Sequence, residues 1–118
     1  MIYKATVEIS CLLGTAPYAN LTKQFQIPFL PTVGLRIAFA MKKIDVDEQR
    51  TYKALATGCA DSTGIIFVES VTYYPEGNAN GDVLRILADP IAEQHEAGIA
   101  AYVKLMQLFY GFTVELVA

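Results

Sequence analysis

The sequence contains no tryptophan, one histidine and two cysteines. A single histidine and the two distant cysteines, Cys11 and Cys59, provide too few ligands for a zinc site and lack the CxxC spacing of a redox dithiol. We therefore expect both cysteines to be reduced thiols in the core, and we expect no metal and no cofactor.

The sequence also lacks an excess of charge of either sign, with 9 basic and 12 acidic residues and a net charge of -3. Binding to a nucleic-acid backbone needs clustered Lys and Arg, so nucleic acid is not an expected partner. An apolar fraction of 53% with only 18% charged residues argues against intrinsic disorder, because such a chain can bury enough surface to offset the entropy of ordering. These values predict a single domain over residues 1–118.

Long hydrophobic runs are absent too. The longest uninterrupted apolar stretches have about five residues, against the ~18 or more that a membrane-spanning helix requires. Residues 1–5 alternate apolar and polar side chains instead of placing a basic region before an apolar run, so they do not predict a secretory signal. We expect a soluble cytoplasmic protein with no membrane partner.

Segments with the alternating pattern of strands make up most of the chain. Three such segments are residues 3–11, 25–29 and 35–41. Residues 65–74 are rich in β-branched and aromatic side chains, which predicts a long strand. Its apolar parity slips at Glu69, so we expect either a β-bulge there or a strand covered on both faces.

The middle of the chain predicts further strands. Residues 42–50 carry charges of both signs and are expected at a solvated hairpin tip. Residues 51–57 are expected to form a strand that ends at a turn. Residues 82–88 alternate and are expected to form a hairpin with the preceding strand.

The last part of the chain predicts one helix and a closing strand. Asp89 and Pro90 are typical of a helix start, helical spacing of apolar residues continues from there, and Gly111 is a typical stop. Residues 112–116 alternate again. The predicted fold class is therefore α+β, a curved antiparallel sheet or partly open barrel of six to seven strands packed against one C-terminal helix, followed by a final strand.

His95 is one of two weak candidates for catalysis. Glu93 and Glu96 stand beside it, so a histidine–carboxylate acid/base pair is conceivable. The helical spacing of His95 with Ile91 and Ile99 instead favours a packed or partly buried histidine.

Glu69 is the second candidate, because it interrupts an apolar strand and would suit acid/base work if it pointed into a pocket. An outward-facing Glu on the polar side of a bulge is the simpler interpretation. Residues 76–81 resemble the first half of a calcium loop, but Leu87 stands where the loop needs a bidentate Glu. We therefore predict a hairpin loop there and no metal site.

Tyrosine and small residues give the clearest pointers to function. Seven tyrosines without tryptophan suggest amphipathic anchors for an interface or a ligand pocket. Tyr73 and Tyr74 are adjacent on one predicted strand, so they point to opposite faces. The predicted helix has a small-residue side, where another backbone can approach closely. We predict five interaction residues: Tyr73, Tyr74, Ala97, Gly98 and Ala101.

Together these patterns favour a non-enzymatic binding or interaction protein that self-associates, such as an inhibitor, an immunity-type protein or an assembly subunit. The apolar fraction of 53% exceeds the usual ~45 to 50%, and a homodimer is the simplest way to cover additional apolar surface. The alternative is a small-molecule-binding barrel or cofactor-free enzyme, with a pocket lined by tyrosines, Glu69 and His95.

Overall fold

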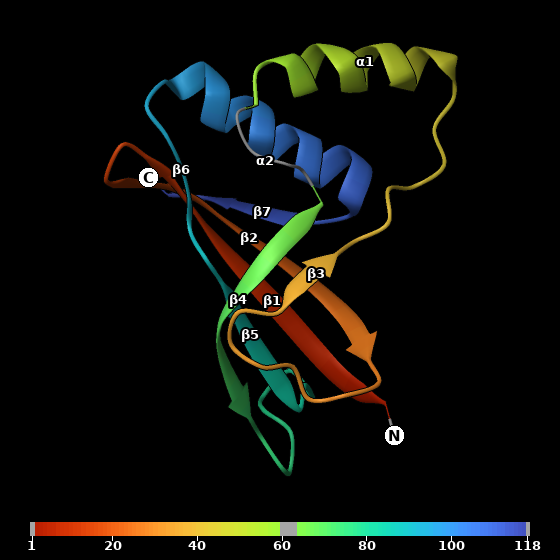
Figure 1. Cartoon of the computed structure of the whole chain (residues 1–118), viewed down its shortest axis with the longest axis vertical. Coiled ribbons are helices and arrows are strands. Elements are labelled where there is room, and N and C mark those ends of the chain that lie inside the picture. Colours follow the sequence, from red (N-terminus) through yellow and green to blue (C-terminus); the bar gives the residue numbers. More distant parts are fainter. Residues whose placement is uncertain (1, 60–63, 118) are drawn as a thin grey trace.

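The structure is a computed structural model that describes residues 2–59 and 64–117. It consists of an open seven-stranded sheet and two helices (Figure 1). The elements in chain order are β1 (Tyr3–Leu13), β2 (Ala16–Ile27), β3 (Arg36–Ala38), α1 (Val46–Thr57), β4 (Ile65–Tyr73), β5 (Leu84–Ala88), β6 (Ile91–Glu93), α2 (Glu96–Tyr110) and β7 (Thr113–Leu116). The predicted α+β class, with a C-terminal helix followed by a final strand, is confirmed.

The sheet is ordered β3-β4-β5-β1-β2-β7, and β6 also pairs with β1. β1 and β2 form a long antiparallel hairpin, whereas β5 and β6 run parallel to β1. The sheet is therefore mixed rather than wholly antiparallel. The reason is that the β4–β5 hairpin is inserted beside β1 after a long crossover, and such a crossover allows parallel pairing.

The core lies between one face of this sheet and α2. α2 contacts β1, β2, β6 and β7. The buried side chains of β1 and α2 are Ala5, Val7, Ile9, Cys11, Ile99, Tyr102, Val103, Leu105, Met106, Phe109 and Tyr110. The alternate residues of β1, such as Lys4 and Glu8, lie on the opposite face, which is open to solvent as is common for antiparallel hairpins.

Residues 28–35, here called the crossing segment, run over the sheet between β2 and β3. They must cross it, because β5, β1 and β4 lie between these two strands in the sheet order (Figure 1). Pro31 in this segment is buried, and Leu35 packs against the core. The crossing segment thus lies on the core side of the sheet, beside the area that α2 contacts.

The prediction of a hairpin tip over residues 42–50 and a strand over residues 51–57 is wrong, because α1 occupies most of this region. Asp45 and Glu48 form a capping box, in which each side chain accepts a hydrogen bond from the backbone N–H of the other residue. Tyr52 then packs edge-to-face on an aromatic ring of α2. The capping spacing is present in the sequence, but the charges of both signs around it favour a solvated turn.

The helix start predicted at Asp89 and Pro90 is also wrong. Residues 91–93 form β6, which extends the ladder along β1, and α2 begins only at Glu96. The predicted end is confirmed, because Gly111 is the C-cap with a left-handed φ of 75°. Of the two alternatives for the parity slip at Glu69, the structure shows the β-bulge, since the β4–β5 register shifts between Val68 and Ser70. No helix in the described ranges is long and apolar enough to cross a membrane.

Candidate interaction surface

The two catalytic candidates lie on separate elements. Glu69 is the exposed extra residue of the β-bulge in β4. His95 is the N-cap residue of α2, and its side chain makes no capping hydrogen bond within the described part of the chain. His95 is exposed, so the expectation of a packed histidine is wrong, because the helix begins one residue after it. Neither residue lines the apolar pocket described below.

The small-residue side of α2 faces the end of α1. A Cβ added to Gly98 would lie 3.4 Å from the backbone oxygen of Gly58 and 3.3 Å from Oε2 of Glu93. The Cβ of Ala101 lies 3.5 Å from the position of a Cβ on Gly58. The close approach that the sequence suggested at Gly98 and Ala101 is therefore made within the chain, whereas Ala97 is exposed.

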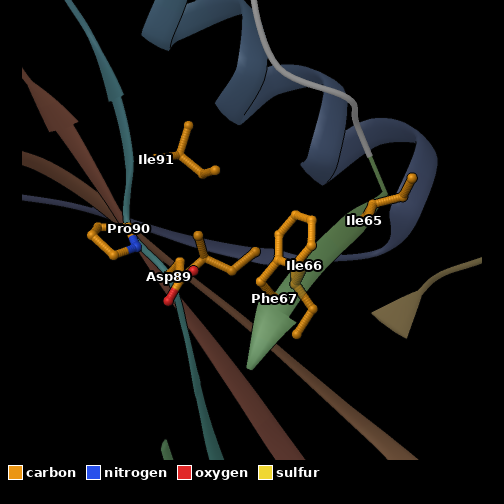
Figure 2. Close-up of a pocket in the computed structure, with 7 residues that line it drawn as sticks. Ile65, Ile66, Phe67, Asp89, Pro90 and Ile91 are labelled. Carbon is orange, nitrogen blue, oxygen red and sulfur yellow. The ribbon is translucent and has the colours of Figure 1, made fainter. Parts of the chain in front are cut away.

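An apolar pocket of about 290 Å³ lies between the start of β4 and the segment that joins β5 to β6. Val68 is the residue of β4 at which pairing with β5 begins, and the backbone N–H of Asp89 donates one further bond to the oxygen of Phe67. Beyond that bond, β4 turns towards β3 while β6 follows β1. Figure 2 shows Phe67 of β4 across from the segment from Asp89 to Ile91, with Ile65 directed away from that segment. The pocket is lined by Ile9, Ile65, Ile66, Phe67, Asp89, Pro90 and Ile91.

The two thiols lie in different places: Cys11 is in the core, and Cys59 follows the C-cap residue of α1. Cys11 is buried, and burial raises the pKa of its thiol to about 12, which makes it unreactive near neutral pH. Cys59 is half-buried, and its thiol donates to the backbone oxygen of Leu55 at 3.4 Å. Over the residues that the structure describes, no group of three or more His, Cys, Asp or Glu side chains could hold a metal ion.

The outer face of the sheet carries paired charges. Nε and Nη2 of Arg85 lie 2.8 Å and 2.7 Å from Oε2 of Glu8. This hydrogen bond and the charge of Glu8 raise the pKa of the Arg85 guanidinium, and Tyr74 adds to the shift. Tyr74 is therefore directed to the outer face, whereas Tyr73 lies opposite Leu84 on the core face. The prediction that the two tyrosines point to opposite faces agrees with this placement.

The loop between β4 and β5 is anchored by Asp82, which is 0% exposed. Its Oδ2 accepts a hydrogen bond from the hydroxyl of Thr6 on β1. Its backbone N–H donates to Oδ1 of Asn78 at 3.0 Å, and its backbone oxygen accepts from the N–H of Asn78 at 2.8 Å. These bonds hold the turn of the β4–β5 hairpin against β1.

Exposed apolar side chains gather on the crossing segment. Phe29 is 50% exposed, Leu30 is 49% exposed and Val33 is 71% exposed. The sequence has no charged residue from Gln24 to Leu35. Exposed apolar patches without charge mark interaction sites more often than ordinary surface does.

The second half of β4 forms an open edge beside this segment. Near its middle, the N–H and the oxygen of Val68 bond to Leu35 and Gly34 of the crossing segment. Residues 70–73, here called the open edge of β4, pair with β5 on one side and with no described strand on the other. Tyr73, a predicted interaction residue, ends this edge and is 52% exposed. The crossing segment and the open edge of β4 together form the candidate interaction surface.

No protein-family model, curated protein sequence or solved structure matches this chain.

Proposed function

We propose that this chain is a non-enzymatic protein-interaction subunit that associates with a second copy of itself. The observation that carries the proposal is the size of its exposed surface. The chain has an accessible surface of 7193 Å², whereas a folded monomer of 12.9 kDa exposes about 6300 Å². Its Cα radius of gyration is 14.7 Å, against about 13.5 Å for a compact domain of this length.

The excess over the average is roughly 900 Å² for the whole chain, which is of the same order as the surface of about 800 Å² that each partner buries in an interface of standard size. The exposed apolar side chains of Phe29, Leu30, Val33 and Tyr73 supply the uncharged character that the centre of such an interface needs. An uncharged apolar patch that is present on every copy can be covered by the same patch of a second copy, so a second copy is the simplest partner.

The positions of Glu69 and His95 support an interaction protein over an enzyme. Both side chains are exposed on separate elements, and an acid/base pair needs its groups within hydrogen-bond reach of one substrate. A homodimer fits an inhibitor, an immunity-type protein or an assembly subunit in the cytoplasm.

Native mass spectrometry over a concentration series tests the proposal, together with light scattering after size exclusion. We expect a species of about 26 kDa, twice the 12.9 kDa of the chain, whose fraction grows with concentration. A mass of 12.9 kDa at all concentrations up to about 1 mM would contradict the proposal.

The apolar pocket supports a second candidate function, the binding of a small molecule. Asp89 is the charged residue of its lining, so the pocket suits a ligand with an apolar body and a cationic group. Benzylamine is a suitable probe. Shifts of the Ile65 and Ile91 methyl signals in NMR, weakened by Asp89→Asn, would support this function, and unchanged signals would reject it.

A further inference from the structure

Within the described residues, the strand edges that are left unpaired at the two ends of the sheet, on β3 and β4 at one end and on β7 at the other, differ in charge. β7 carries Glu115 in its middle, and β3 has three residues and carries Arg36. Charged residues and short length are the usual means of protecting an edge strand from pairing with another chain. The open edge of β4, residues 70–73, carries no charge, because its four residues are Ser, Val, Thr and Tyr, and the bulge at Glu69 lies just before it.

The hydrogen-bonding direction of this edge follows from its pairing with β5. The backbone N–H of Tyr74 donates to the oxygen of Val83, and Thr72 lies opposite Arg85 in the same register. Because bonded and non-bonded pairs alternate in an antiparallel ladder, the N–H and C=O groups of Val71 and Tyr73 point away from β5. In the described part of the chain, no backbone hydrogen bond from another segment reaches these groups.

We infer that a second copy of this chain docks on the open edge of β4, so that β4 pairs antiparallel with β4 of the other copy. The inference rests on the proposed function and adds its geometry. The two-fold axis passes through Thr72, which lies opposite Thr72 of the second copy. Val71 then lies opposite Tyr73, and each such pair exchanges both main-chain hydrogen bonds.

The side chains at this register suit one another. A Thr–Thr pair and a pair of an aromatic with a β-branched residue are both favourable across antiparallel strands. Tyr73 is directed to the core face, the side on which the crossing segment lies. Val33 precedes Gly34, whose N–H bonds to Val68 directly above the open edge. A second copy that pairs with this edge therefore also faces the apolar side chains of the crossing segment, which lies on the core side of the sheet.

The same two-fold pairing of β7 with β7 of a second copy is unfavourable. The N–H of Val117 donates to the oxygen of Tyr18, so the outward backbone groups of β7 belong to Val114 and Leu116. Pairing these two residues across a two-fold axis places Glu115 opposite itself. Like charges directly opposite one another destabilise a strand pair.

Charge variants at Thr72 test the register. Thr72 is exposed on the outer face opposite Arg85, so Thr72→Glu gains an oppositely charged neighbour within one chain. In the dimer the same substitution places two carboxylates opposite each other, and we expect Kd to rise at least about tenfold. Thr72→Lys also weakens the dimer by placing two ammonium groups opposite each other, and because the introduced lysine faces Arg85 within its own chain, the free energy of unfolding of this variant is measured together with its Kd. Mixing the two variants restores a dimer that contains one chain of each.

The matched control is Thr113→Glu, which places the same charge on an exposed threonine of the β7 edge. We expect its dimer to match the wild type by native mass spectrometry, and circular dichroism verifies the fold of every variant. A wild-type dimer that Thr72→Glu leaves intact would overturn the inference while the proposed function stands. Two dissociated variants that fail to form the mixed dimer would overturn the register. A monomeric wild type would overturn the proposed function itself.

Discussion

Replacing Thr6 with Val should lower the free energy of unfolding by about 2 kcal/mol, the cost of leaving a buried polar group without its donor. The hydroxyl of Thr6 donates to Oδ2 of Asp82, whose side chain is 0% exposed. Oδ1 of Asp82 has no hydrogen-bond partner among the described residues, so the Thr6 hydroxyl carries the side-chain bonding of this carboxyl. Val has nearly the same shape as Thr and suits a strand, so packing on β1 changes little.

Thermal and urea unfolding followed by circular dichroism measure this effect. For a domain of this length, a loss of about 2 kcal/mol lowers Tm by about 8 °C. Thr22→Val is the matched control, because Thr22 lies on the outer face of neighbouring β2 and should change stability by less than about 0.5 kcal/mol. Equal stability losses for the two variants would refute the role of Thr6 in holding the turn that follows the open edge of β4.

Three further predictions concern packing, pH and affinity. Gly64→Ala should lower the free energy of unfolding in urea by about 3 kcal/mol, because Gly64 has a φ of +76° and a Cβ there would lie within 2.9 Å of the Tyr110 ring. A loss below about 1 kcal/mol would contradict this packing. Burial raises the pKa of Cys11 from 9.0 to about 12, so its thiol adds stability below pH 9 that is lost as the pH rises towards 12. Unfolding free energies should fall more steeply over that range in the wild type than in Cys11→Ala, and parallel curves would exclude the effect. Val33→Ser should raise the dimer Kd about tenfold, whereas Val46→Ser on α1, also mostly exposed, should leave Kd unchanged; equal effects would remove Val33 from the interface.

Sequence patterns predicted the elements that are determined by residues close to one another in the chain. Strict alternation over residues 3–11 identifies β1, because one face of this strand is buried and the other is solvated. The parity slip at Glu69 identifies the bulge for the same reason. Gly111 identifies the end of α2, since the left-handed conformation of a helix C-cap favours glycine.

Long-range pairing decided the elements that the sequence did not reveal. Asp89 and Pro90 carry the signals of a helix start, but residues 91–93 become β6 because β1 extends past β5 and offers a free ladder. α1 has no fully buried residue, so its apolar pattern is weak, and only the Asp45 capping box marks it.

The candidate surface was visible in part. Tyr73 and Tyr74 were expected on opposite faces of one strand and in an interface, and Tyr73 is 52% exposed. Its role in an interface stays a prediction. The sequence contains the uncharged run through Phe29 and Leu30, but strand order is a property of the whole fold. The sequence therefore did not show that this run crosses the sheet and reaches an open edge.

Amide hydrogen exchange by NMR at two protein concentrations tests the central claim most directly, because it reports on single backbone groups. The account predicts that the amides of Val71 and Tyr73 become protected as the concentration rises through Kd. The amides of Val114 and Leu116 on the β7 edge should exchange at the same rate in both samples. Unchanged exchange at Val71 and Tyr73 in a sample that is dimeric by light scattering would contradict the account.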